Sequence, residues 1–407
     1  MYSRGKIYAP ASKSYFQRAM AIASLTKGIT VLKNVSWCDD TLAVKLMIRQ
    51  LGSIIRKKGR NLVIESNGLI LNESVFNAGE SGLALRMFAP VLAMTDKNVV
   101  IRGDGSLKKR PAGQVTDALS RFGVGVSDNN GFLPLKIKGP VKPGIVKIDG
   151  SLTSQVLTGL LIALPLAAGD SEIIVDNLKS KPYIDMTLEI INHFGVDIKH
   201  DNYQRFFIKG NQKYKATDYS IEGDWSGAAF FLVAGAVSGE VEVFNLDLNS
   251  KQADKRIIDV LKSAGADVVT KSDSVIVKKK DLEAFEFDAT DCPDLFPPLV
   301  CLAAACKGTS VIKGVSRLKH KESDRATILQ KEFGNLGLRI NFRDDLMEVT
   351  GGKINISAVD SHGDHRIAMA AGVMSLLSGK EIVINGEEAV NKSYPGFFDD
   401  LKALQRQ

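Results

Sequence analysis

Residues 79–103 read GESGLALRMFAPVLAMTDKNVVIRG. A turn containing Gly and Ser leads into a largely apolar stretch at 83–94, and an apolar strand follows at 98–103. Serine before the stretch is a good N-cap, because its side-chain oxygen accepts hydrogen bonds from the free N–H groups of a helix start. A helix that is apolar on nearly every face is buried rather than amphipathic. The stretch therefore predicts a buried helix followed by a strand.

This pattern of turn, apolar stretch, polar turn and strand occurs six times, at a period of roughly 70 residues. The other five apolar stretches lie at 15–26, 152–166, 227–237, 295–306 and 367–377. Such a period is too long for a solenoid repeat and is typical of a small α/β subdomain. The repeat therefore predicts an α/β protein built from six similar units.

Amphipathic segments and alternating strands lie between the apolar stretches. We expect outer helices at 40–51, 113–122, 184–194, 255–265 and 325–336, and strands at 61–65, 133–138, 205–209, 274–278 and 346–350. Each unit then runs strand, helix, strand, helix, strand, strand. Six units most simply form two halves of three, with the boundary near 219–224. The early strand Ile7–Tyr8 can pair with either half.

Composition is that of an ordinary globular protein, with 44% hydrophobic and 24% charged residues. There is no uncharged apolar run of about 18 residues, and the start MYSRGKIYAP has no signal-peptide core, so we expect no membrane span. The four cysteines at 38, 292, 301 and 306 indicate reduced core thiols of a cytosolic protein. Their spacing to the histidines does not fit zinc, and we expect no metal. The net charge of +7 comes without a basic block that includes aromatics, which argues against nucleic acid.

Charged segments recur near the starts of the predicted helices. Five of them place cations beside hydroxyl, small or acidic residues, at 10–14, 108–113, 180–185, 321–325 and 363–366. Helix N-termini add partial positive charge and free N–H donors. These segments together predict a site that binds phosphate and carboxylate groups and moves protons between them.

Five motifs carry a resemblance to a known family. They are Ser-Lys-Ser at 12–14, Lys-x-Arg-Pro at 108–111, Ser-x-Pro-Tyr-Ile-Asp at 180–185, Lys-Glu-Ser-Asp-Arg at 321–325 and Asp-His-Arg at 364–366. In this order and spacing the chain resembles the 5-enolpyruvylshikimate-3-phosphate (EPSP) synthases, or 3-phosphoshikimate 1-carboxyvinyltransferases. The resemblance implies two similar domains, each of three βαβαββ units in an inside-out α/β barrel, with a substrate cleft between them. It places residues 14–222 in one domain, and 1–13 with 223–407 in the other.

The resemblance also implies the reaction. The enolpyruvyl group of phosphoenolpyruvate passes to the 5-hydroxyl of shikimate 3-phosphate through a tetrahedral ketal intermediate, and phosphate leaves. This is a step of the shikimate pathway to chorismate and the aromatic amino acids. It implies two small-molecule substrates, no cofactor and a cytoplasmic monomer, with glyphosate as the family's inhibitor at the donor site.

Residue roles follow from the motif positions. The resemblance implies shikimate 3-phosphate ligands at Lys13, Ser14, Arg18, Thr153, Ser154, Gln155, Ser180, Tyr183, Asp294 and Lys321. It implies phosphoenolpyruvate ligands at Lys13, Gly82, Arg86, Arg110, Gln155, Arg325, Arg366 and Lys392. The implied catalytic residues are Lys13, Asp294 as base at the 5-hydroxyl, and Glu322 as the group that exchanges the C3 proton. We expect His365 to support this set, and Asp364 and Asp324 to orient neighbouring cations.

The chain departs from the family pattern in the donor loop. Glu80 stands where the family usually has Asn, Leu83 where it has Thr, and Met87 where Pro is common; Ala11 replaces a Gly. We expect a reshaped turn at Gly82 and weaker inhibition by glyphosate than is usual.

Two other functions stay open. The first is a UDP-N-acetylglucosamine enolpyruvyl transferase, which typically has Lys-Asn in the first motif and a cysteine before Arg-Pro. Here the first motif has Lys13-Ser14, and 103–109 contains no cysteine. The second is an RNA-end cyclase-like protein, whose sign is RNA affinity with a steep salt dependence.

Overall fold

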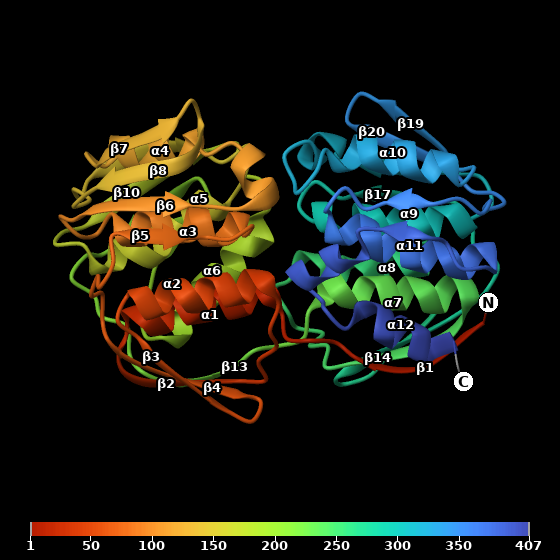
Figure 1. The fold of residues 1–407 in the computed structure, drawn as a ribbon, viewed down its shortest axis with the longest axis horizontal. Coiled ribbons are helices and arrows are strands. Elements are labelled where there is room, and N and C mark those ends of the chain that lie inside the picture. The colour runs from red at the N-terminus through yellow and green to blue at the C-terminus, as the bar shows by residue number, and fades with distance from the viewer. Residues whose placement is uncertain (1, 406–407) are drawn as a thin grey trace. The chain divides into compact units, whose positions relative to one another are not determined.

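The computed structural model describes residues 2–405. The chain divides into two compact units. One comprises residues 13–221 and is called here the central unit; the other, the flanking unit, comprises residues 1–12 together with 222–407. Figure 1 shows helices enclosed by strands in each of them.

The central unit contains three buried helices, three outer helices and twelve strands. Its helices are α1 (Lys13–Leu25), α2 (Asp39–Gln50), α3 (Gly82–Leu92), α4 (Gly113–Arg121), α5 (Gln155–Ala163) and α6 (Lys181–His193), with short 3₁₀ helices η1 (Gly105–Lys109) and η2 (Leu164–Leu166). Its strands are β2 (Lys27–Lys33), β3 (Ile54–Lys58), β4 (Asn61–Asn67), β5 (Val75–Asn77), β6 (Asn98–Arg102), β7 (Gly125–Asn129), β8 (Phe132–Lys138), β9 (Ile145–Asp149), β10 (Ser171–Asp176), β11 (Lys199–Asp201), β12 (Arg205–Ile208) and β13 (Asp218–Ser220).

The flanking unit repeats this plan. Its helices are α7 (Trp225–Ser238), α8 (Ile257–Ser263), α9 (Phe296–Ala305), α10 (Arg325–Asn335), α11 (His365–Ser378) and α12 (Phe397–Gln405), with 3₁₀ helices η3 (Ala253–Arg256), η4 (Pro293–Leu295), η5 (Val315–Leu318) and η6 (Glu387–Lys392). Its strands are β1 (Ser3–Tyr8), β14 (Gly239–Phe244), β15 (Asp267–Thr270), β16 (Ser274–Lys278), β17 (Glu286–Asp288), β18 (Thr309–Lys313), β19 (Arg339–Arg343), β20 (Leu346–Thr350), β21 (Val359–Asp360) and β22 (Ile384–Asn385).

The sheets show the predicted repeat directly. Five have four strands, in the orders β13-β2-β4-β3, β5-β6-β8-β7, β9-β10-β12-β11, β1-β14-β16-β15 and β17-β18-β20-β19. In each, the first two strands are parallel and the other pairings are antiparallel. A parallel pair needs a crossover connection, and the buried helix supplies it in three of these five sheets. The sixth sheet holds only β21 and β22.

Two strands are exchanged along the sequence. β1 comes first in the chain, but it pairs with β14 of the flanking unit, from Ser3 opposite Gly239 to Tyr8 opposite Phe244. β13, near residue 220, pairs back with β2 of the central unit. Each strand therefore pairs with a strand that lies far away in the sequence.

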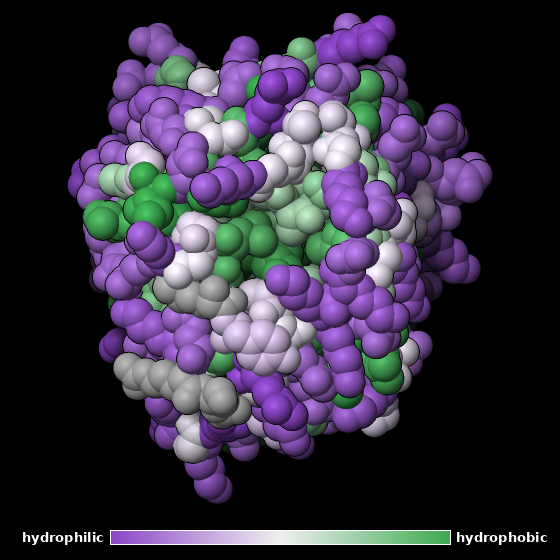
Figure 2. Space-filling view, turned by 90° about the vertical axis from the view of Figure 1, so that its right-hand side faces the viewer, coloured by the Kyte–Doolittle hydropathy of each residue, from purple (hydrophilic) through white to green (hydrophobic). Residues whose placement is uncertain are grey.

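The buried helices form the cores. α7, α9 and α11 pack against one another, and nearly every side chain of these helices is buried. In the central unit α3 packs tightly against α5, and α1 packs against α2 and α6. No helix within residues 2–405 is long and apolar enough to cross a membrane. The molecular face in Figure 2 is mainly hydrophilic, with hydrophobic residues gathered near its middle.

Candidate active site

Helix N-termini gather the predicted residues of the central unit. Gln17 of α1 donates to the hydroxyl of Ser81, the N-cap of α3, at 3.1 Å. Arg86 of α3 reaches the Gln155 side chain at the start of α5 at 3.4 Å. These bonds place the starts of three buried helices together, where their N–H groups and partial positive charge favour an anion.

Arg18 is fixed beneath these helix starts. The side chain is 1% exposed, and its guanidinium donates to Thr187 Oγ1 at 2.9 Å and to the Ser14 carbonyl at 2.9 Å. It also reaches Thr158 Oγ1 at 3.5 Å and the Tyr183 carbonyl at 3.3 Å. Burial lowers the pKa of Arg18 to about 10, against the opposing effect of Tyr183 and Tyr15. The group is therefore charged at neutral pH and is held in place by neutral oxygens.

Two further arginines meet at the start of α3. Arg86 donates to the Gly82 carbonyl at 3.1 Å and to the Pro111 carbonyl at 2.7 Å. The guanidinium of Arg110 packs directly on Gly82, where an added Cβ would lie 2.6 Å from Nη1 and 2.8 Å from Nη2. A larger residue at position 82 would displace this guanidinium from the backbone of α3.

The Glu80 departure has a structural explanation. Its carboxylate accepts hydrogen bonds from the Ser106 backbone N–H at 2.8 Å and from the Ser106 hydroxyl at 2.7 Å. The negative charge therefore lies at the N-terminal turn of η1, where the exposed N–H groups favour it. Glu80 braces the segment that leads to Arg110.

The remaining central-unit residues are held locally. Lys13 pairs with Asp40 of α2 at 2.7 Å, a partner that the sequence alone did not reveal because an acid at a helix start resembles an ordinary first-turn residue. The Gln155 backbone N–H donates to Thr153 Oγ1 at 3.2 Å. Ser180 precedes α6 in a left-handed conformation, with φ of 58°. Ser154, the residue before α5, is buried.

The flanking unit contains a compact cluster around Asp294. Oδ1 of Asp294 accepts from Lys321 at 3.1 Å and from Arg325 at 2.9 Å. Oδ2 accepts from Arg366 at 3.1 Å. These four residues come from η4, the loop after η5, α10 and α11, which are far apart in the sequence. Three of the sequence-predicted cations are thus assembled on one carboxylate.

Arg325 is the centre of this network. Its side chain is fully buried, and it donates to both oxygens of Asp364, at 3.0 and 3.1 Å, and to Glu322 at 2.7 Å. Asp364 also caps α11 by accepting from the Arg366 N–H at 2.9 Å. Asp364 therefore orients a cation, as expected from its place in the motif. Asp324 does not: its carboxylate accepts from the Thr327 N–H and caps α10.

The charges shift the proton affinities of the cluster. Burial alone would raise the pKa of Asp294, but Arg366, Lys321 and Arg325 outweigh it and hold the pKa well below its usual value. Burial lowers the pKa of Lys321, against the attraction of Asp294. Asp294 is consequently an ionised carboxylate at any pH near neutrality.

Two further residues of the flanking unit were predicted from the sequence to belong to the site. Lys392 of η6 donates to the Gly363 carbonyl at 2.8 Å, which ties it to the loop before α11. His365, the first residue of α11, is buried. Within residues 2–405 no group of three or more His, Cys, Asp or Glu side chains is placed to hold a metal ion.

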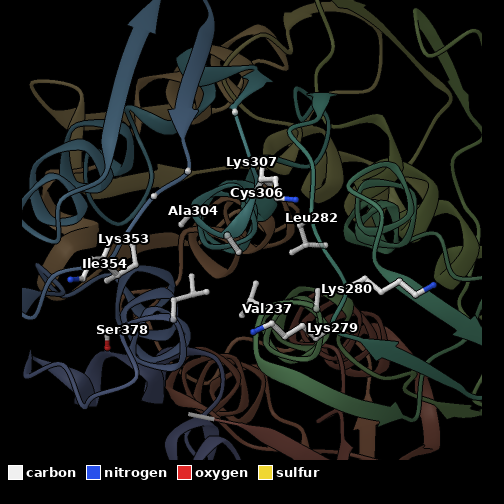
Figure 3. A pocket seen from close by; sticks show the side chains of 16 residues that line it. Val237, Lys279, Lys280, Leu282, Ala304, Cys306, Lys307, Lys353, Ile354 and Ser378 are labelled. Atoms are coloured by element: carbon white, nitrogen blue, oxygen red, sulfur yellow. The ribbon is translucent and has the colours of Figure 1, made fainter.

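The opposite ends of the same buried helices line a different cavity. It has a volume of about 550 Å³ and is bordered by the last turns of α7, α9 and α11. Figure 3 shows apolar side chains such as Val237 and Leu282 around it, with Lys279 and Lys307 nearby. Lys307 pairs with Asp281 at 3.7 Å and with Glu283 at 3.8 Å. None of the sequence-predicted site residues lines this cavity.

Comparison with known proteins identifies the family of this chain. The family described as EPSP synthase (3-phosphoshikimate 1-carboxyvinyltransferase) matches residues 2–401. The chain belongs to the EPSP synthase family. The 3-phosphoshikimate 1-carboxyvinyltransferase of Clostridium perfringens (strain SM101 / Type A) is 39% identical, over 98% of this chain and 96% of its own. That of Clostridium acetobutylicum is 38% identical, over 98% and 95%.

Solved structures give the same result for the fold. An EPSP synthase from Acinetobacter baumannii is 25% identical and matches with a TM-score of 0.83, covering 99% of this chain and 96% of its own. The enolpyruvyl transferase NikO from Streptomyces tendae is 16% identical, with a TM-score of 0.79 and 99% and 95% coverage, and shares the fold. The likeness to EPSP synthases confirms the α/β fold predicted from the repeat.

Proposed function

We propose that the protein is a 3-phosphoshikimate 1-carboxyvinyltransferase, which transfers the enolpyruvyl group of phosphoenolpyruvate to the 5-hydroxyl of shikimate 3-phosphate and releases phosphate. Membership of the EPSP synthase family supports this reaction. The observation that carries it at the site is the ionised Asp294 surrounded by Lys321, Arg325 and Arg366. Such a cluster can bind anions and accept a proton from a hydroxyl group.

The acceptor is assigned first to residues of the central unit. Its phosphate group carries negative charge and strong acceptor oxygens, which suit the helix N-termini and hydroxyl groups around Ser154 and Arg18. The proposed ligands of shikimate 3-phosphate are Lys13, Ser14, Arg18, Thr153, Ser154, Gln155, Ser180, Tyr183, Asp294 and Lys321. Arg18 already donates four hydrogen bonds to the protein, so its main contribution is a fixed positive charge.

The donor is assigned to the arginines. Guanidinium groups bind phosphate and carboxylate oxygens in pairs, which suits phosphoenolpyruvate. The proposed ligands are Lys13, Gly82, Arg86, Arg110, Gln155, Arg325, Arg366 and Lys392. Gly82 allows the Arg110 guanidinium to lie on the backbone at the start of α3. Because Leu83 and Met87 are buried beside this turn, we keep the expectation of weak glyphosate inhibition.

Proton transfer is assigned to Lys13, Asp294 and Glu322, with His365 in a supporting role. The low pKa of Asp294 makes it a weak base toward a free alcohol. The hydroxyl proton becomes acidic as the oxygen bonds to C2, so Asp294 accepts it while that bond forms. Glu322 starts protonated, gives its proton to C3 in the addition step and takes one back from C3 in the elimination step, while the proton held by Asp294 leaves with the expelled phosphate.

We propose that the two units are the two domains of the family, that the protein acts as a cytoplasmic monomer, and that it needs no metal or organic cofactor. Gel filtration coupled to light scattering at micromolar concentration tests the monomer. A mass of twice the chain would contradict it.

Phosphate release tests the reaction. We expect release from phosphoenolpyruvate with shikimate 3-phosphate, and none with UDP-N-acetylglucosamine or without an acceptor. Asp294→Asn should lower kcat by roughly 10²–10⁴-fold, the usual contribution of a general base. Asp281→Asn, an exposed residue of the same unit, is the control and should keep the wild-type rate. Equal rates with both acceptors would contradict the proposal.

A further inference from the structure

One buried carboxyl group beside the Asp294 cluster has no part in the reaction described above. Asp254 lies in η3 and is 1% exposed. One of its oxygens accepts a hydrogen bond from the hydroxyl of Ser226, in the first turn of α7. The other, Oδ1, is buried without a hydrogen-bond partner in the part of the chain that the structure describes.

Charged groups from three neighbouring elements act on Asp254. They are Asp224, the N-cap of α7; Asp294 of η4; and Arg366 of α11. Arg366 uses Nη2 on Asp294 at 3.1 Å, and its other terminal nitrogen, Nη1, is buried without a hydrogen bond among residues 2–405. The pKa of the Cys292 thiol is raised by burial and, to a smaller extent, by the negative charge of Asp254. Two carboxyl groups therefore depend on the field of one guanidinium.

The two carboxyl groups differ in proton affinity. Burial, and then the negative charge of Asp294, raise the pKa of Asp254 to about 7, against the opposing effects of Arg366 and Ser226. Asp294 instead has three cations as direct partners and stays ionised. Near neutral pH, Asp254 is therefore the member of the pair whose charge can change.

We propose that Asp254 is a positioning residue, which takes up a proton from solvent when an anionic ligand engages Arg366 and so keeps the Asp294–Arg366 ion pair intact. An anion at Arg366 cancels part of the positive field that holds Asp254 ionised. With the field reduced, an ionised Asp254 would repel both Asp294 and the ligand. Protonation removes this repulsion at the cost of one proton from the buffer. The inference rests on the proposed function only in taking the ligand to be a phosphate-bearing anion.

Proton uptake on binding is the measurement. Shikimate 3-phosphate with inorganic phosphate forms a complex that cannot turn over, and it can be titrated by calorimetry at pH 8 in two buffers of different protonation enthalpy. We expect the wild type to take up a fraction of one proton, which Asp254→Asn loses. Protons exchanged by the ligands themselves are common to both proteins, so the difference belongs to Asp254. Equal uptake by the two proteins would overturn the proposal.

Two further variants sharpen the test. Asp259→Asn removes the same charge from an exposed position on α8 and should behave as the wild type. Ser226→Ala removes the hydroxyl that stabilises the ionised form, so it should move the uptake to higher pH. The KM for phosphoenolpyruvate should rise above pH 7 by up to about tenfold per pH unit in the wild type, and less in Asp254→Asn. Absence of any binding heat in the wild type would refute the proposed function. If both proteins bind the ligands and Asp254→Asn takes up as many protons as the wild type, only this inference is refuted.

Discussion

The hydrogen-bond partners of each charged side chain at this site indicate whether that side chain binds a ligand or supports its neighbours. The guanidinium of Arg325 donates hydrogen bonds to Asp294, Glu322 and Asp364, and the side chain is fully buried. A buried ion pair gains little net stability, but removing one partner leaves an uncompensated charge. Arg325 is therefore best understood as the support of Asp294 and Glu322, in addition to its proposed contact with the donor.

Arg110 has a more direct role, and its removal should weaken donor binding selectively. Arg110→Ala should cost about 1.5–3 kcal/mol, or roughly ten- to a hundredfold in phosphoenolpyruvate affinity, because one charge-assisted contact is lost. Binding of shikimate 3-phosphate alone should change little. Calorimetry of each ligand measures both effects, and Arg121→Ala, an exposed arginine at the end of α4, is the control. The reverse pattern would show that the donor assignment is wrong.

Asp254 should make stability depend on pH in a defined direction. Its folded pKa of about 7 is above the ordinary pKa of an aspartate, so the folded state is favoured most below about pH 4 and loses stability as the pH rises toward 7. Asp254→Asn removes this loss. Urea unfolding at pH 5 and pH 8 measures this effect. Relative to the wild type, the unfolding free energy of the variant should increase by on the order of a few kcal/mol from pH 5 to pH 8. A constant difference at both pH values would contradict the shift.

Among the elements, the pair α3 and α5 shows how packing determines the position of a functional side chain. A Cβ on Gly159 of α5 would lie 2.6 Å from the Arg86 carbonyl oxygen and 2.9 Å from Met87 Cα. The backbones of α3 and α5 therefore touch at the point from which the Arg86 side chain projects. This close approach places Arg86 within reach of Gln155.

Gly159→Ala should force these helices apart. We expect a loss of about 1–3 kcal/mol in unfolding free energy, as for other overpacked sites, together with a higher KM for phosphoenolpyruvate. Gly334→Ala in α10 is the matched control, because nothing lies within 4 Å of its added Cβ. That variant should be neutral or gain up to about 0.5–1 kcal/mol. Similar losses in both variants would show that contact with α3 is not the cause.

Sequence reasoning located the elements better than their ends. The buried helices follow the apolar stretches, because burial on all faces leaves a pattern that is visible in a single chain. α5, however, begins at Gln155 rather than at Leu152, because Thr153 bonds the Gln155 N–H and forms a turn. The expected strand at the end of the sixth repeat shortens to Ile384–Asn385. Pairing partners, rather than local composition, decide such limits.

At the scale of the whole molecule, the chain crosses from one unit to the other at two neighbouring points. Ala11 and Gly223 form an isolated antiparallel bridge, and the Ser12 N–H donates to the Glu222 carbonyl at 2.8 Å. The repeat predicted a division into halves but left the partner of the first strand open, and only the family resemblance placed residues 1–13 with residues 223–407. Pairing of β1 with β14 is a contact over more than 200 residues, which no local pattern contains.

The long-range pairing can be tested with the two tryptophans, because each unit contains one. Ile7 of β1 is buried opposite Val243, so Ile7→Asp places a charge in the flanking core and should cost about 3 kcal/mol or more. In a Trp37→Phe background, Trp225 should report a lower urea midpoint. In a Trp225→Phe background, Trp37 should report a smaller change. Arg4→Asp, exposed on the same strand, is the control.

Sequence motifs named many of the residues that the structure brings together, while the residues that support them were not visible. Lys321, Glu322 and Arg325 stand in one motif, and the structure brings the motif to Asp294. Asp40 and Asp254 occupy ordinary acidic positions, and only folding shows that one pairs with Lys13 and the other is buried. Burial of a lone acid depends on distant elements, so it leaves no local signal.

The position of β1 in the chain also determines when its sheet can form during synthesis. A ribosome produces residues 3–8 well before their partner strand, which begins at residue 239. At about 5–20 residues per second, the nascent strand waits roughly 10 to 50 s before β14 exists. During that interval the whole central unit, including β13 as the last strand of its first sheet, has already been translated. Residues 3–8 are thus made early, but they can complete their sheet only after translation has passed residue 244.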